Sequence, residues 1–197
     1  MKKSIKILSV LLILVFCLAF VVACNEPDGP TIDNSKYYDE ITSTLTLTKS
    51  FEGKSFLTDG IGRATLISHT DGDTSRFRLE QGNIAVSVRY YQIDTPESTY
   101  EVDPWGKAAS NFTSKILRNA REIILEAEGA EYDSYGRRLA YVWVDGILLN
   151  LYIVQEAYSN STAPLSSKYG NIMMEVANEV RKTGRRFYGE TDPDYKG

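Results

Sequence analysis

The chain has 197 residues, 43% hydrophobic and 24% charged, so it can bury an ordinary core without disulfide staples. Both cysteines lie in the first 24 residues and there is one histidine, His69, which excludes Cys-based zinc sites, thiol catalysis and multi-histidine metal centres from the body of the chain. The formal net charge of −4 argues mildly against a nucleic-acid partner, since such binders usually carry a basic surface. We expect His69 to be a surface or packed residue, and any chemistry to use carboxylates, arginines and a hard metal ion.

The first 23 residues have the pattern of an export signal. Three lysines precede an uncharged apolar run at 7–23, which falls short of the about 20 residues that span a membrane. A small residue then precedes Cys24, a placement that resembles the lipobox of bacterial lipoproteins. We predict a removed signal peptide at 1–23 and lipidation of Cys24, which would anchor the protein to the outer face of the bacterial membrane. An ordinary secretory signal and an uncleaved anchor are the alternatives.

The composition divides the rest of the chain into three parts. Residues 24–50 are polar and acidic and are predicted to form a tether, in which Thr-rich 43–49 could add an edge strand. Residues 51–190 are predicted to form the folded domain, and 191–197 a C-terminal tail. Basic residues cluster at 137–138 and between 181 and 186. The second cluster is either a solvated helix end or a contact for an anionic partner.

The hydrophobic periodicity of the body predicts an α+β protein. About five strands, with one helix inside the strand series and two after it, suit a small closed barrel. An OB fold is the first candidate, although periodicity leaves other α+β folds open. The predicted elements are strands at 64–67, 74–80 and 84–93, a helix at 105–120, strands at 123–125 and 139–144, and helices at 148–157 and 166–183.

Three polar segments of the body stand out when they are considered together. They are Asp71–Thr74 (DGDT), Arg89–Glu97 (RYYQIDTPE) and Asp133–Tyr141 (DSYGRRLAY). Each alone is typical of a turn. Together they resemble the staphylococcal (micrococcal) nuclease family, in which these motifs occur in this order and at about these separations. The resemblance covers about residues 62–189, nearly the whole body.

The resemblance implies a fold, an activity and a cofactor. The implied fold is a five-stranded OB-fold β-barrel with three helices. The implied activity is Ca²⁺-dependent hydrolysis of phosphodiester bonds in DNA and/or RNA, leaving 3′-phosphate ends. By resemblance, the carboxylates of Asp73 and Asp94 and the carbonyl of Thr95 bind the metal, and Asp71 orients these ligands. An oxygen-only set of this kind suits Ca²⁺.

The resemblance also assigns the groups that act on the phosphodiester. Glu97 would hold or deprotonate the attacking water. Arg89 and Arg137 would grip the phosphate through forked N–H donors, which lysine cannot reproduce. Tyr135 resembles a tyrosine that touches a terminal phosphate. These residue types suit a transition state whose negative charge spreads over the phosphate oxygens.

The sequence departs from the family pattern at positions that affect binding. Ser134 stands where well-studied members carry lysine. Ala163 lies near the position of a base-stacking aromatic residue, for which Tyr158 or Tyr169 could substitute. The acidic balance, −7 once the three N-terminal lysines are removed, also differs from the basic family type. These departures concern affinity and base preference rather than the reaction.

Two other function classes remain as alternatives to the nuclease. One is a non-catalytic OB module that binds single-stranded nucleic acid or another surface ligand. The other is an anchored surface protein that binds cell-wall polymer and keeps the site as a relic. The presence of all the acidic and arginine site residues favours the enzyme. The expected partners are DNA and/or RNA and, through Cys24, the membrane; no protein partner is implied, and a monomer is expected.

Overall fold

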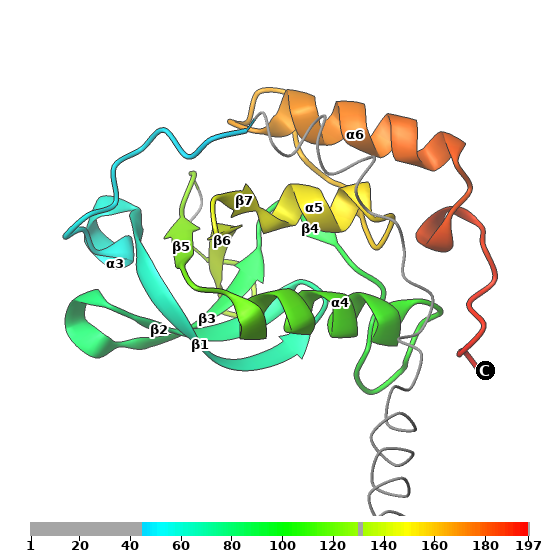
Figure 1. Cartoon of the computed structure of the whole chain (residues 1–197), viewed down its shortest axis with the longest axis horizontal. Helices are drawn as coiled ribbons and strands as arrows, with labels where there is room; N and C mark the ends of the chain where they lie inside the picture. Colours follow the sequence, from blue (N-terminus) through cyan, green and yellow to red (C-terminus); the bar gives the residue numbers. More distant parts are fainter. Residues whose placement is uncertain (1–44, 130–131, 197) are drawn as a thin grey trace, which may run out of the picture. The chain divides into compact units, whose positions relative to one another are not determined.

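The computed structural model describes residues 45–129 and 132–196, which all belong to one compact unit, Tyr37–Gly197 (Figure 1). The signal at 1–23, Cys24 and most of the tether lie outside these residues. Within the described part of the chain, no helix has the length and apolar character needed to cross a membrane.

Five strands form a closed mixed barrel, as predicted. Neighbouring strands pair antiparallel in the order β3-β2-β1-β5-β6, and a parallel pairing between β3 and β6 closes the barrel. The strand β7 (Ile147–Leu148) extends the sheet beyond β6. The barrel strands are β1 (Ile61–Asp71), β2 (Thr74–Leu79), β3 (Ala85–Tyr90), β5 (Ile123–Glu126) and β6 (Arg138–Val144).

Side-chain alternation explains which faces of the strands are buried. In β2, Phe77 and Leu79 point into the core while Arg76 and Arg78 point to water, the period-2 pattern of a strand with one solvated face. In β5 all four residues are buried, because that strand is covered on both faces. The largest side chains at the centre of the core are Trp143, Tyr90, Tyr141 and Phe77.

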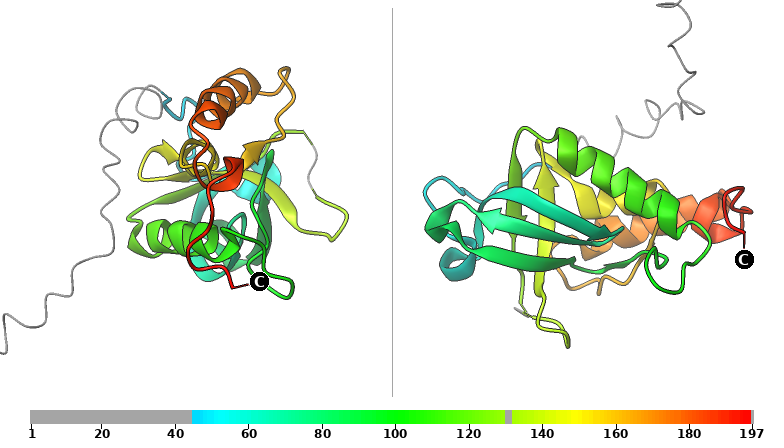
Figure 2. Two further views of the ribbon diagram at one scale, coloured as in Figure 1. Left: turned by 90° about the vertical axis from the view of Figure 1, so that its right-hand side faces the viewer. Right: turned by 90° about the horizontal axis from the view of Figure 1, so that it is seen from below.

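Within residues 45–129 and 132–196, three helices of seven or more residues accompany the barrel, as predicted. They are α4 (Gly106–Asn119), which packs against β1, α5 (Leu149–Gln155), which packs against β6, and α6 (Gly170–Lys182), which packs against α5 (Figure 2). The last helix begins four residues later than predicted, because a turn in which the Ser167 N–H bonds the Pro164 carbonyl occupies its expected start. A short helix, α3 (Phe56–Asp59), was not predicted.

The strand predicted at 84–93 is interrupted, and this interruption positions part of the site. β3 ends at Tyr90, and Gln92 adopts a positive φ of 64°, which turns the chain out of the barrel. The next two residues form β4 (Ile93–Asp94), which pairs antiparallel with β8 (Asn160–Ser161) in a separate sheet. Asp94 therefore sits beside the barrel rim instead of continuing the barrel strand.

Two further expectations have clear outcomes. The described residues 45–49 contain no strand; Leu45 and Leu47 instead pack their side chains against the core. His69 is a packed residue, one of the two outcomes expected for it. Its Nδ1 lies 3.0 Å from the Ser75 hydroxyl, and its Nε2 lies 3.0 Å from the Ser110 hydroxyl. Burial lowers its pKa, although the nearby Asp71 acts in the opposite direction.

Candidate active site

The tight turn between β1 and β2 carries the first acidic motif. The hydroxyl of Thr113 in α4 donates to the Gly72 carbonyl at 2.7 Å, which ties the turn to the helix. A side chain at Gly72 would be placed 2.6 Å from the Thr95 hydroxyl, so glycine allows the two acidic segments to touch. Asp71, 8% exposed, accepts the Gly72 N–H through Oδ1.

Asp73 is a buried carboxylate on which several donors converge. Its Oδ2 accepts the Thr95 N–H at 2.8 Å and the Thr95 hydroxyl at 3.0 Å, and lies 3.0 Å from Nη1 of Arg89. Its Oδ1 accepts the Thr74 hydroxyl. Burial raises the pKa of the Asp73 carboxyl above its ordinary value, and the Arg89 guanidinium only partly offsets this.

Arg89 joins the two predicted metal-binding carboxylates. Its Nη2 donates to Asp94 Oδ1 at 2.6 Å, while Nη1 reaches Asp73 and also bonds the main-chain carbonyl of Ile93 at 2.7 Å. Asp94 itself is mainly exposed, and its backbone N–H is bonded to the Ser159 hydroxyl at 2.8 Å. Ser159 is therefore a support for Asp94 that the sequence alone did not indicate.

Arg137 approaches the same place from the start of β6, the strand that pairs with β3. Its Nη1 donates to the Thr74 hydroxyl at 3.1 Å, and that hydroxyl bonds Asp73. Thr74 of β2 pairs with Arg89 of β3 in the sheet, so both arginines lie next to the Asp73–Thr74 dipeptide. Guanidinium groups that meet in this way can hold an oxyanion with several N–H donors at once.

Asp133 organises the turn before β6. It is the first residue of the third sequence motif, and the sequence predicted no role for it. Its Oδ2 accepts Nε of Arg137 at 2.6 Å, and its Oδ1 accepts the backbone N–H groups of Tyr135 and Arg137. Asp133 thus fixes both the turn and the arginine. The sequence contains a signal for this role, because an aspartate stands just before a turn and four residues before an arginine. Aspartate side chains commonly bond backbone N–H groups two residues further along the chain.

Glu97 is exposed at the edge of this cluster. Partial removal from water and then the neighbouring carboxyls of Asp71, Asp73 and Asp103 raise the pKa of Glu97 above its ordinary value. A carboxylate with a raised pKa is a stronger base, which suits the role of proton acceptor. The structure therefore brings Asp71, Asp73 and Glu97 together, as the resemblance implies.

A cavity of about 420 Å³ lies beside the two arginines. Arg89, Arg137, Tyr91 and Tyr135 are among its lining residues. Tyr135 is 84% exposed, and its ring centre lies 5.4 Å from the Arg137 guanidinium carbon. The Tyr135 side chain is thus accessible next to the Arg137 guanidinium, and Tyr91 is a second aromatic residue here that the sequence did not single out.

The two proposed substitutes for a base-stacking residue are buried elsewhere. Tyr158 packs against Phe112 and beneath the Arg186 guanidinium, and Tyr169 packs against Trp143 and donates its hydroxyl to Glu126. Both rings lie in the core cluster. The expectation that either tyrosine could stack on a base is therefore wrong, because packing between helices and barrel covers them.

The acidic cluster fits a hard divalent cation. Four carboxyl groups, those of Asp71, Asp73, Asp94 and Glu97, gather here, and Arg89 pairs with only two of them. Among the described residues no three His, Cys, Asp or Glu side chains form a metal-binding group by themselves. The ligands would therefore be the Asp73 and Asp94 carboxylates completed by a main-chain carbonyl and water, a set that Ca²⁺ accepts.

The last two arginines of the basic cluster at 181–186 have a structural role. Arg186 is 7% exposed; its Nη1 contacts the Glu156 backbone carbonyl and lies 2.9 Å from Oε2 of the buried Glu156 carboxylate. Arg185 donates to the Gln155 carbonyl at 3.0 Å. The two alternatives given for this cluster, a solvated helix end and an anionic contact, therefore both miss the structural role of these two arginines, which fasten the C-terminal segment to the end of α5.

We expect Arg186→Ala to lower the free energy of unfolding by about 3–5 kcal/mol, because the substitution removes the close partner of the buried Glu156 carboxylate and leaves it only Nη1 of Arg185 at 3.9 Å. Denaturant unfolding measures this. The matched control is Arg181→Ala, whose exposed guanidinium bonds Asn160 at 3.3 Å and should contribute less than about 1 kcal/mol. Equal stabilities for Arg186→Ala and the unchanged protein would contradict a structural role.

A closed five-stranded barrel with carboxylates and two convergent guanidinium groups at its rim defines an OB-fold protein equipped for chemistry on an oxyanion. The family described as "Staphylococcal nuclease homologue" matches residues 87–188, a range that contains the arginines and Glu97 but begins after Asp73. The chain belongs to this family.

Named relatives agree with this assignment. A thermonuclease of Staphylococcus intermedius is 35% identical over 130 residues, which are 64% of this chain and 76% of the relative. A thermonuclease of Staphylococcus hyicus is 35% identical over 94 residues, 46% of this chain and 54% of the relative. The SPbeta prophage-derived endonuclease YokF of Bacillus subtilis is 44% identical over 86 residues, 42% of this chain and 28% of the relative.

Proposed function

We propose that this protein is an exported, Ca²⁺-dependent nuclease that hydrolyses phosphodiester bonds of DNA and/or RNA and leaves 3′-phosphate ends. The observation that carries the proposal is the convergence of Arg89 and Arg137 on the Asp73–Thr74 dipeptide, with the carboxylates of Asp94 and Glu97 beside it. The names of the relatives, thermonuclease and endonuclease, support the same reaction.

In the proposed mechanism the two arginines hold the scissile phosphate. Their N–H donors are held in place before the substrate arrives, Arg89 by carboxylates and main-chain carbonyls and Arg137 by Asp133. Such preorganised donors stabilise the charge that develops on the phosphate oxygens. Glu97 accepts the proton of the attacking water, which adds to phosphorus in line with the departing 5′-oxygen. When bound, Ca²⁺ would supply positive charge beside the phosphate.

We expect cleavage to require Ca²⁺ at about 10⁻⁴–10⁻³ M, the range of extracellular sites, and to stop in excess chelator. The reason is that the proposed ligands, the buried Asp73 and the exposed Asp94, form an oxygen-only site. The measurement is cleavage of a short labelled DNA and of the matching RNA, with chelator alone and after Ca²⁺ is added back. Undiminished cleavage in chelator would exclude the calcium assignment.

We also propose that Cys24 is lipidated and anchors the protein to the outer face of the membrane, on the evidence of the sequence pattern alone. Cys24→Ser should stall processing or release the protein into the medium. The reason is that the serine variant lacks the acyl chains that would hold the domain at the bilayer. Cys17→Ser is the control and should leave the protein at the membrane. A mature, fully soluble wild-type protein whose N-terminus is not Cys24 would refute the anchor.

A further inference from the structure

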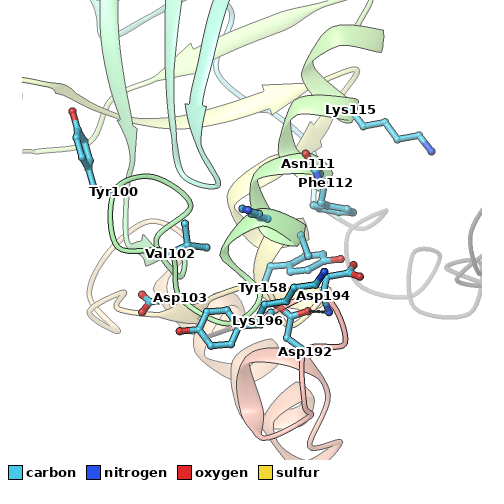
Figure 3. A pocket seen from close by; sticks show the side chains of 13 residues that line it. Tyr100, Val102, Asp103, Asn111, Phe112, Lys115, Tyr158, Asp192, Asp194 and Lys196 are labelled. Atoms are coloured by element: carbon cyan, nitrogen blue, oxygen red, sulfur yellow. Dashed lines mark hydrogen bonds between the residues drawn. The ribbon is translucent and has the colours of Figure 1, made fainter.

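The loop that carries Glu97 is held almost entirely by hydrogen bonds. No side chain of residues 97–104 is buried, so hydrophobic packing does little to fix this loop. On its outer side lies a cleft of about 880 Å³, across which Val102 and Asp103 of the loop face Asp192 and Lys196 of the C-terminal segment (Figure 3). The position of Glu97 must therefore depend on the few polar contacts that the loop makes.

Asp103 closes the loop on Glu97 by two reciprocal bonds. Its Oδ2 accepts the Glu97 N–H at 3.1 Å, and its own N–H donates to the Glu97 carbonyl at 2.9 Å. Gly106, the first residue of α4, lies directly against the same carbonyl: a Cβ there would be 1.9 Å from the Glu97 oxygen. The backbone of Glu97 is thus hydrogen-bonded to Asp103 and packs against the first residue of α4.

A second support comes from residues Glu190–Asp192, here named the C-terminal strap. Asp192 Oδ2 accepts the Trp105 N–H at 2.6 Å, and the Glu190 carbonyl accepts the Trp105 indole N–H at 2.9 Å. Figures 1 and 2 show the C-terminal segment descending from α6 to the beginning of α4. The strap is itself fastened upstream by the buried pair between Arg186 and Glu156.

The residue that the strap holds is conformationally strained. Trp105 has a φ of 67°, a left-handed conformation that bulky residues rarely adopt and that costs of the order of 1–3 kcal/mol. Such a conformation persists only when its surroundings enforce it. Here the two bonds from the strap enforce it, and the next residue is Gly106, on which the Glu97 carbonyl rests.

We propose that Asp103 and Asp192 are positioning residues for Glu97, Asp103 by bonding its backbone directly and Asp192 by holding Trp105 and the start of α4. The inference rests on the proposed role of Glu97 as proton acceptor. A general base acts only within hydrogen-bond reach of the attacking water, so a displacement of about 1 Å can cost up to about 100-fold in rate. The C-terminal strap is then part of the machinery of the site.

The first experiment needs no cleavage. Amide hydrogen exchange of the full chain should show the Glu97 amide exchanging up to about tenfold faster in Asp103→Ala, and the Trp105 amide likewise in Asp192→Ala. The control is Asp194→Ala, which removes an acid from the same segment; among the described residues its carboxylate makes no hydrogen bond to the loop. Unchanged exchange in the first two variants would overturn the proposal, whether or not the protein is a nuclease.

The second experiment separates positioning from general damage. Asp103→Ala and Asp192→Ala should lower kcat about 10–100-fold with little change in KM, and each loss should shrink below about twofold in a Glu97→Gln background. Asp103→Asn keeps an oxygen acceptor and should restore most of the rate. A loss that persists in the Glu97→Gln background would overturn the proposal. An inactive wild-type protein in Ca²⁺ would instead refute the proposed function, and the exchange result would still decide whether the two acids hold the loop.

Discussion

Glu97→Gln is expected to lower kcat by about 10²–10⁴-fold, the usual contribution of a general base. Glutamine keeps the shape of the side chain but cannot accept the proton of the attacking water. The affinity for nucleic acid should hardly fall, because the loss of a negative charge cannot weaken attraction to phosphate. The measurements are kcat and Kd on one short DNA at a fixed salt concentration.

The same variant should also change the pH profile. A general base works only when deprotonated, so activity should rise with pH through the pKa of Glu97, which its partial removal from water and its acidic neighbours raise. Glu97→Gln should remove that rising limb. Glu101→Gln, a change of the same charge in the same exposed loop, is the control. Wild-type cleavage rates in Glu97→Gln would show that the site is misassigned. That result would favour the alternative function, a non-catalytic OB module that binds nucleic acid or another ligand.

Arg137→Lys is expected to lower kcat by about 10²–10³-fold, the loss typical of removing one preorganised donor to the transition state. The structure adds a reason to the difference between the two side chains. Arg137 bonds Asp133 through Nε and Thr74 through Nη1, and retains further N–H donors for a phosphate. An ammonium group keeps the charge but cannot meet all these partners in one plane.

The neighbouring arginine offers a matched control for this prediction. Arg138 lies in β6 with its guanidinium carbon 4.2 Å from the centre of the Tyr132 ring. Arg138→Lys makes the same chemical change one residue away and should alter kcat less than about threefold, since this side chain stacks on a ring outside the acidic cluster. Equal losses in both variants would mean that Arg137 acts through general charge rather than through its fork.

Local sequence determined most of the helices and strands of the fold. Aspartate–glycine turns, alternating strands and helical periodicity are short-range properties, so β2, α4 and the DGDT turn were predicted within a few residues of their bounds. The carboxylates and arginines could be named because the three motifs together resemble those of the nuclease family. The resemblance then implied the barrel that joins them.

Only the tertiary structure decided how those residues meet and what supports them. Arg137 reaches Thr74 across 63 positions of sequence, and Asp192 reaches Trp105 across 87, separations that no local pattern encodes. Arg186 appeared as surface charge in the sequence but is buried against Glu156. The physical reason is the same in each case: burial and pairing of a charge depend on which distant segments pack beside it, and the closure of the barrel with its helices sets that packing.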